Sequence, residues 1–102
     1  MVKKILLACS GGFSTSMLVQ KMVEAAEKKN MDIEIIAVAE ENIENHLDSD
    51  VLLLGPQIGH KLEDLTKELE FPVFVINMAD YGLMNGEKVL KETLEKVNIG
   101  GI

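Results

Sequence analysis

Apolar positions along the chain follow two alternating patterns. Four short stretches are dominated by aliphatic residues and predict strands: residues 3–8, 32–39, 51–54 and 71–76. Their nearly continuous apolar character is typical of strands buried on both faces. Four further stretches predict helices, mostly because apolar residues recur every three or four positions: residues 14–30, 40–47, 58–69 and 87–97. Residues 77–82 are expected to form a loop, and residues 98–102 a loose tail.

The alternation of strands with helices predicts one α/β domain that spans residues 1–102. Strands joined through helices form parallel sheets, and right-handed crossovers place helices on both faces of such a sheet. A chain of 102 residues is long enough to bury one core. We therefore expect a doubly wound, four-stranded parallel sheet in the flavodoxin-like order 2-1-3-4.

Ligands of such sheets bind beyond the carboxyl ends of the strands, where the strand order reverses. In the order 2-1-3-4, this point lies between the first and third strands. Three loops should meet there: residues 9–16, 55–57 and 77–82. The sequence therefore predicts a functional rim, on which Pro56, Gln57 and Tyr81 are candidate contacts for a bound anion or a partner.

The first of these loops has the composition of an anion-binding cradle. Its glycines allow backbone N–H groups to converge, and the helix that follows adds about half a positive charge at its N-terminus. Its four hydroxyl groups exceed what a helix cap needs, and phosphate is the natural ligand of such a loop. The residues expected to hold the phosphoryl group are Ser10, Gly11, Gly12, Phe13, Ser14, Thr15 and Ser16.

Cys9 directly follows the first strand and stands at the edge of this cradle. Donors that hold a phosphate also stabilise a thiolate, and a thiolate aimed at an anion cradle is placed for nucleophilic attack on phosphorus. The alternative role is that of a small buried hydrophobic residue, which is common for an isolated cysteine. A lone cysteine forms no intrachain disulfide, which favours a reducing compartment.

Composition argues against several other functions. The net charge of −7 disfavours nucleic-acid binding and electrostatic attachment to anionic lipid. All ten basic residues are lysine, so the chain lacks the arginine that usually clamps a phosphate. The two histidines, His46 and His60, show no metal-ligand spacing, and we expect no metal site and no cofactor. The acidic stretch at residues 40–50 is expected to be a solvated face.

Three families share part of the first loop. Low-molecular-weight tyrosine phosphatases have a Cys-x5-Arg-Ser/Thr motif there, but Thr15 occupies the arginine position. PP-loop ATP pyrophosphatases have Ser-Gly-Gly-x-Asp-Ser, but Ser14 occupies the aspartate position. Flavodoxins hold the FMN phosphate in a hydroxyl-rich loop, but they need aromatic side chains against the flavin, for which this chain offers Tyr81 and Phe13. A cysteine phosphatase and a non-catalytic phosphate- or nucleotide-binding module are therefore open alternatives.

A fourth resemblance extends over nearly the whole chain. Residues 9–19 read Cys-Ser-Gly-Gly-Phe-Ser-Thr-Ser-Met-Leu-Val. They resemble the Cys-Ser-Ala-Gly-Met-Ser-Thr-Ser-Leu-Leu-Val signature of IIB components of the bacterial sugar phosphotransferase system, of the lactose/cellobiose/chitobiose type. Residues 53–58 and 80–90 resemble the second and C-terminal blocks of that family. Gly11 and Phe13 replace a common alanine and a common methionine.

The resemblance implies a phosphotransferase that works through a phosphocysteine. In this family a phosphohistidine on a IIA partner passes its phosphoryl group to the cysteine, here Cys9. The phosphocysteine then passes the group to a sugar held by the membrane component IIC, and the sugars of this type are β-linked disaccharides such as cellobiose, chitobiose and lactose. The resemblance also implies a cytoplasmic protein that associates peripherally with the permease. We expect a monomer, because one site must be open to two partners.

Overall fold

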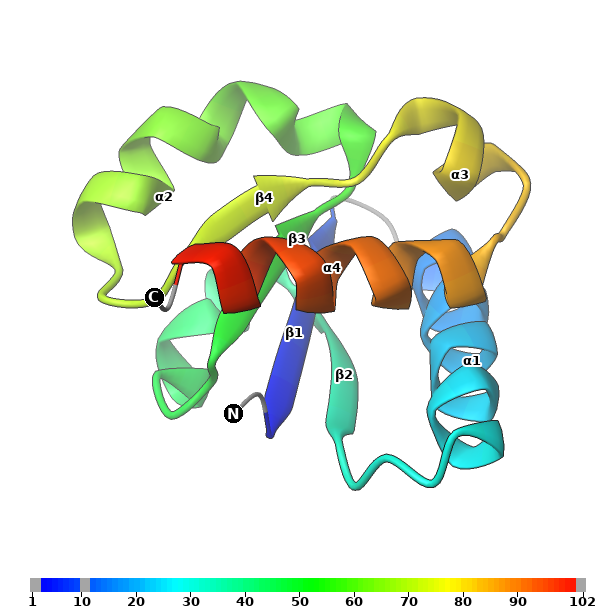
Figure 1. Ribbon diagram of the computed structural model, residues 1–102. Helices are drawn as coiled ribbons and strands as arrows, with labels where there is room; N and C mark the ends of the chain where they lie inside the picture. Colours follow the sequence, from blue (N-terminus) through cyan, green and yellow to red (C-terminus); the bar gives the residue numbers. More distant parts are fainter. Residues whose placement is uncertain (1–2, 10–11, 101–102) are drawn as a thin grey trace.

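Four parallel strands form the centre of the protein in the computed structural model, which describes residues 3–9 and 12–100 (Figure 1). The strands are β1 (Lys4–Cys9), β2 (Glu34–Ala39), β3 (Val51–Leu54) and β4 (Val73–Val75). Their order in the sheet is β2-β1-β3-β4, and every neighbouring pair is parallel. The predicted doubly wound sheet with the order 2-1-3-4 is therefore confirmed.

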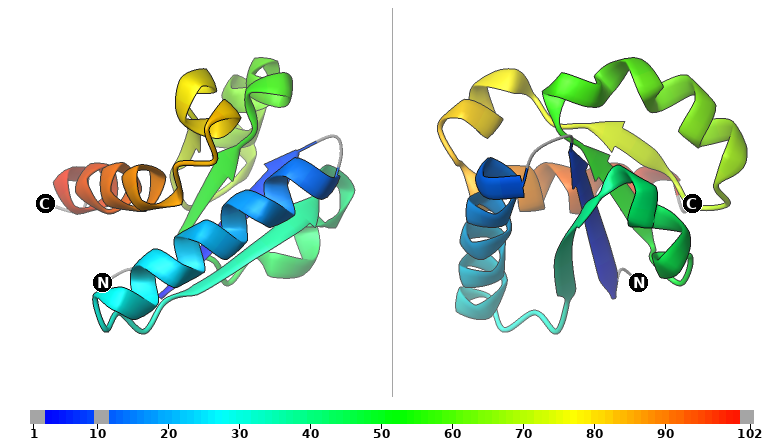
Figure 2. Two further views of the ribbon diagram at one scale, coloured as in Figure 1. Left: turned by 90° about the vertical axis from the view of Figure 1, so that its right-hand side faces the viewer. Right: turned by 180° about the vertical axis from the view of Figure 1, so that it is seen from behind.

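Helices cover both faces of the sheet (Figures 1 and 2). One face packs against α1 (Gly12–Lys28) and α4 (Gly86–Gly100). The other face packs against the 3₁₀ helices η1 (Glu40–His46) and η2 (Pro56–Lys61), and against α2 (Leu62–Glu68). Successive side chains of β1 point to opposite faces of the sheet. Ile5 and Leu7 pack in the core beneath α1 and α4, and Leu6 and Ala8 pack in the core on the other face. Burial on both faces explains why the strand sequences are continuously apolar.

Three elements differ from the sequence-based expectations. Residues 77–82, expected as a loop, contain the short helix α3 (Met78–Gly82), because the Asn77 side chain caps it: its Oδ1 accepts the Ala79 N–H at 2.8 Å. The helix expected at residues 58–69 is divided between η2 and α2, with a non-helical backbone at Ile58. The loose tail expected at residues 98–102 is wrong for residues 98–100, which continue α4 to its end at Gly100.

Helix α4 approaches α1 so closely that only glycine fits at the contact. A Cβ atom at Gly86 would lie 2.5 Å from the backbone carbon of Lys21 and 2.5 Å from the Met22 nitrogen. Both of those atoms belong to the backbone of α1, so no side-chain rotation relieves the overlap. The lack of a side chain at Gly86 therefore lets α4 pack directly against α1, over the buried core on this side of the sheet.

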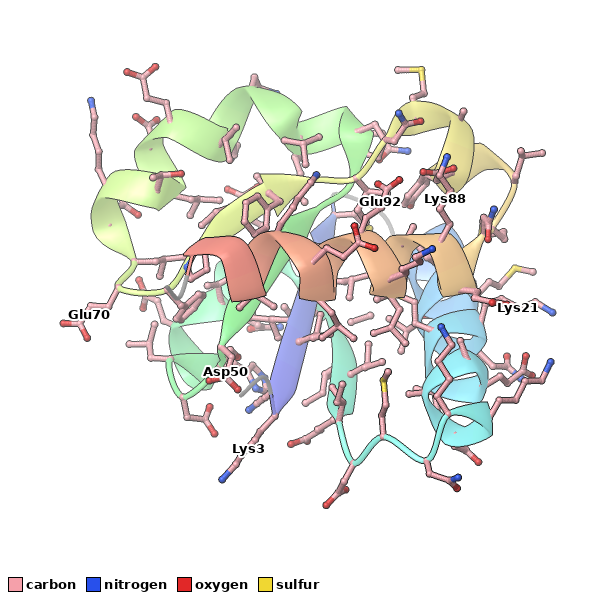
Figure 3. All side chains as sticks on the ribbon, in the orientation of Figure 1. Lys3, Lys21, Asp50, Glu70, Lys88 and Glu92 are labelled. Atoms are coloured by element: carbon pink, nitrogen blue, oxygen red, sulfur yellow. The ribbon has the colours of Figure 1, made fainter. Side chains whose placement is uncertain are left out.

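Part of the acidic stretch holds the start of β1, at the end of the sheet opposite Cys9. The Asp50 carboxylate accepts the Lys3 and Lys4 backbone N–H groups at 2.7 and 2.9 Å, and Figure 3 labels Lys3 and Asp50 side by side there. Lys4 Nζ donates to Asp48 at 2.9 Å, and Lys61 pairs with Glu40. Asp48 is solvated as expected, whereas the half-buried Asp50 and Glu40 are engaged in contacts that hold the fold.

The pKa of Asp48 lies below its ordinary value, chiefly because Lys4 donates a hydrogen bond to the carboxylate. We expect Lys4→Met to raise the pKa of Asp48 towards that ordinary value, measured by following the carboxyl carbon in an NMR titration. A folded-state pKa that is lowered contributes stability above the unfolded pKa, and this contribution is lost as the pH falls through the folded pKa.

Lys3→Met is the matched control for this titration. It removes the same charge one residue away, but leaves the Lys3 backbone N–H that Asp50 accepts. If both variants raised the pKa of Asp48 equally, general charge would account for the effect rather than the Lys4 hydrogen bond.

Candidate functional site

Cys9 is the last residue of β1, one of the two inner strands of the sheet. It lies opposite Ala39 at the end of β2, and only 6% of its surface is exposed. The carboxyl ends of the strands, the start of α1 and helix α3 gather at the same end of the molecule (Figures 1 and 2). The structure thus places Cys9 where the strand order reverses, as ligand sites of open parallel sheets require.

Helix α1 begins at Gly12, three residues after Cys9 and two residues earlier than expected. Its 17 residues direct their positive dipole end and first N–H groups towards the region just beyond β1. Ser10 and Gly11 lie outside the described residues, as do the side chains of Phe13, Ser14 and Thr15. Ser16 is exposed in the second turn of α1. The expected roles of these cradle residues stay predictions.

Gly55 directly follows β3 and lies beside Cys9. Its N–H donates to the Ala8 carbonyl at 2.9 Å, which continues the pairing of β3 with β1 up to the residue before the cysteine. A Cβ atom at Gly55 would lie 3.1 Å from Cys9 Cβ. Gly55 therefore provides room for the cysteine. The sequence pattern does not reveal this role, because a glycine that follows a strand is usually part of a loop.

The Gln57 side chain folds back over Gly55. Its Oε1 lies 2.9 Å from the position that a Cβ of Gly55 would occupy, so Gln57 and Cys9 flank the same small space. Gln57 is exposed, and Pro56 is half-buried as the first residue of η2. Of the predicted rim contacts, these two lie at the carboxyl end of β3, next to the cysteine.

The third predicted rim contact, Tyr81, is buried on α3 with 6% of its surface exposed and packs in the core cluster beneath α1 and α4. Its neighbour Asp80 is also buried, and Asp80 Oδ1 pairs with Lys88 Nζ at 3.3 Å. Lys88 projects from α4 beside Glu92, as Figure 3 shows. This ion pair ties α3 to α4.

Apolar side chains are exposed around this end of the molecule. Met78 and Leu83, at the two ends of α3, are 75% and 77% exposed, and Met17 on α1 is 56% exposed. Exposed apolar side chains near a candidate site are candidates to contact another protein.

Neither histidine lies in a metal site within the described residues. His46 Nδ1 is 3.3 Å from Lys4 Nζ, at the opposite end of the sheet from Cys9, and His60 is exposed on η2. Among residues 3–9 and 12–100, no three histidine, cysteine, aspartate or glutamate side chains are grouped to hold a metal ion. In the same residues, every helix is too short or too polar to cross a membrane.

A comparison with protein families finds one that covers most of the chain. The model described as "PTS system, Lactose/Cellobiose specific IIB subunit" matches residues 4–92. The chain is 45% identical over 97 residues to the galactose-specific EIIB component of Lactococcus lactis subsp. cremoris, covering 86% of this chain and 90% of that protein. It is 45% identical, with the same coverage, to the cellobiose-specific EIIB component of Lactococcus lactis subsp. lactis.

Further similarities come from a more distant relative and from solved structures. The oligo-beta-mannoside-specific EIIB component of Bacillus subtilis is 40% identical over 97 residues, covering 91% of this chain and 94% of that protein. The cellobiose-specific IIB component of Borrelia burgdorferi superposes with a TM-score of 0.79 at 44% identity, covering 94% of this chain and 92% of that one. The lactose-specific IIB domain of Streptococcus pneumoniae has the same fold, with a TM-score of 0.80 at 18% identity and coverage of 93% and 97%.

Proposed function

The chain belongs to the lactose/cellobiose-specific IIB family of the sugar phosphotransferase system, and we propose that it relays a phosphoryl group through Cys9. One observation carries the proposal: Cys9 ends an inner strand at the point where the strand order reverses, three residues before the N-terminus of α1. Residues 1–102 act in this proposal as one carrier domain.

The proposed reaction has two displacements at phosphorus. In the first, the Cys9 thiolate attacks the phosphoryl group of a phosphohistidine on a IIA partner, so that a P–S bond forms and a P–N bond breaks. The electron pair of the broken bond stays on the imidazole of the partner. In the second, a sugar hydroxyl oxygen attacks the phosphocysteine, so that a P–O bond forms, the thiolate leaves, and the hydroxyl proton passes to a base or to water.

The absence of arginine suits a carrier better than a phosphatase. A phosphorylated side chain carries roughly −1.5 to −2 charges, by analogy with phosphoserine. In this proposal the N-terminus of α1 and the cradle residues 10–16 balance that charge without a guanidinium group. Such moderate stabilisation keeps the phosphocysteine long enough to be handed on, whereas an arginine clamp with a general acid favours hydrolysis.

The proposed sugar is a β-linked disaccharide of the cellobiose, chitobiose or lactose class, held by the membrane component IIC. Two relatives of this chain at 45% identity carry the names of different sugars, galactose and cellobiose. This supports a division in which IIC selects the sugar and the IIB chain supplies the phosphoryl group. The protein then works as a cytoplasmic monomer at the membrane surface, with Met17, Met78 and Leu83 available to meet its partners.

Reconstitution tests the proposal. The protein is incubated with phosphoenolpyruvate, the general phosphotransferase proteins and a IIA protein from the galactose- or cellobiose-type systems, and its intact mass is measured. We expect one added phosphoryl group, lost when membranes that contain IIC and cellobiose are added, with cellobiose phosphate as the product. If the IIA protein is phosphorylated and this chain never is, the relay is wrong, and titration with phosphate and nucleotides would test the non-catalytic binding module instead.

A further inference from the structure

We propose that the Gln57 carboxamide binds the phosphoryl group while it is attached to Cys9, and that Gly55 leaves the space that this contact needs. The inference rests on the proposed function and adds a binding residue to the same site. It assigns to a neutral side chain on η2 a contact that phosphate-binding enzymes often obtain from arginine.

The geometry around Gly55 carries the proposal. A Cβ atom on Gly55 would lie 2.9 Å from Gln57 Oε1 and 3.1 Å from Cys9 Cβ. Because glycine has no such atom, the carboxamide closes over the backbone and reaches the neighbourhood of the cysteine. Cys9 and Gln57 are thus brought together by the ends of two neighbouring strands, although 48 positions separate them in the sequence.

The chemistry of a carboxamide fits the contact. The amide nitrogen of glutamine has two N–H donors, and rotation of the amide plane by half a turn exchanges the oxygen and the nitrogen at the same position. Gln57 is exposed, so its side chain has room for that rotation when a phosphoryl group arrives. An N–H donor to an anionic oxygen makes a charge-assisted hydrogen bond, which is stronger than a neutral one.

The charge distribution supports a neutral donor in this position. All basic residues of the chain are lysines, and several of those in the described part are engaged with carboxylates: Lys4 with Asp48, Lys61 with Glu40, and Lys88 with Asp80. Each of these pairs holds elements of the fold together. A donor without charge also leaves the phosphoryl group easier to release to the next acceptor.

Substitutions at Gln57 test the inference by the rate of phosphoryl transfer from phosphorylated IIA protein, measured by rapid quench and intact mass. Gln57→Met keeps the length of the side chain and removes the donor. Gln57→Glu keeps the shape and adds a negative charge. We expect kcat to fall about 10-fold for Gln57→Met, as the loss of one charge-assisted hydrogen bond implies, and further for Gln57→Glu, with little change in KM for the IIA protein.

Gln20→Glu is the matched control, because it makes the same chemical change at the other glutamine of the chain, which is exposed on α1. We expect its rate to equal that of the wild type. The ³¹P chemical shift of the phosphocysteine gives a second readout, which should move in Gln57→Met and stay fixed in Gln20→Glu. Gly55→Ala should also slow transfer, because its new Cβ crowds both the carboxamide and Cys9, whereas Gly59→Ala meets only Val75 at 3.4 Å and should not.

Three outcomes would overturn the inference. Gln57→Met could transfer at the wild-type rate with an unchanged ³¹P shift, which would show that the amide makes no contact with the phosphoryl group. A rise in KM with kcat unchanged would assign Gln57 to partner docking instead. Equal losses in Gln57→Glu and Gln20→Glu would point to net charge. A wild-type protein that accepts no phosphoryl group would refute the proposed function itself, and is therefore distinguishable from all three.

Discussion

Cys9→Ser is expected to abolish the phosphoryl adduct while the fold is retained. The substitution replaces Sγ by a slightly smaller oxygen at a position that is 6% exposed, so the packing against Gly55 changes little. A serine hydroxyl is a far weaker nucleophile than a thiolate unless a base activates it. We expect transfer from phosphorylated IIA protein to fall by at least about 10³-fold, and the intact mass to remain that of the unmodified chain.

The fold of this variant is checked independently by urea unfolding. Burial of a hydroxyl in place of a thiol should cost no more than about 2 kcal/mol of unfolding free energy. Cys9→Ala serves as a second variant, since it introduces no new polar group. Stoichiometric phosphorylation of a folded Cys9→Ser or Cys9→Ala protein would show that another residue accepts the phosphoryl group.

Gly86→Ala is expected to destabilise the fold more than the same exchange at Gly55, Gly59 or Gly82. The added Cβ would lie 2.5 Å from backbone atoms of Lys21 and Met22, a distance that real Cβ atoms essentially never show. Helix α4 must then move away from α1 and loosen the core on that side of the sheet. We expect the free energy of unfolding to fall by about 3 kcal/mol, measured as a lower urea midpoint with an unchanged m-value.

Gly82→Ala is the matched control, because a Cβ at Gly82 meets nothing within 4 Å. In that variant the unfolding free energy should change by no more than about 0.5 kcal/mol, the range usual for surface substitutions. If Gly86→Ala proved as stable as Gly82→Ala, the distance between α4 and α1 at Gly86 would have to be larger than in the structure.

The sheet could be predicted from the sequence because its inner strands, β1 and β3, are buried on both faces. Residues such as Leu52 and Leu53 alternate between the two core clusters, so no polar position interrupts the run. The strand order could be chosen correctly because a flavodoxin-like arrangement is one of few that short right-handed crossovers permit. Helix α3 was missed because five residues are too few to show periodicity, and its stability comes from the Asn77 cap.

The candidate site could be predicted only in part, because some of its contacts join residues that are far apart in the sequence. The cradle and Cys9 are contiguous in sequence, so their composition points to phosphate chemistry without any knowledge of the fold. The contact between Gly55 and Cys9 joins two strands, and nothing in the local pattern distinguishes it from an ordinary strand end. The burial of Tyr81 likewise depends on how α3 packs under α1 and α4, which single-residue composition does not encode.

The position of β1 has a consequence for the motions of the chain around Cys9. Ile5, Leu6, Leu7 and Ala8 have no exposed surface, and strands on both sides hydrogen-bond to this segment. Backbone amides in such a strand exchange with solvent deuterium mainly through global unfolding, so β1 should be among the last segments to exchange. Cys9 is thus held at the end of a rigid strand, and in the proposed relay the phosphoryl donor and the acceptor must both come to it.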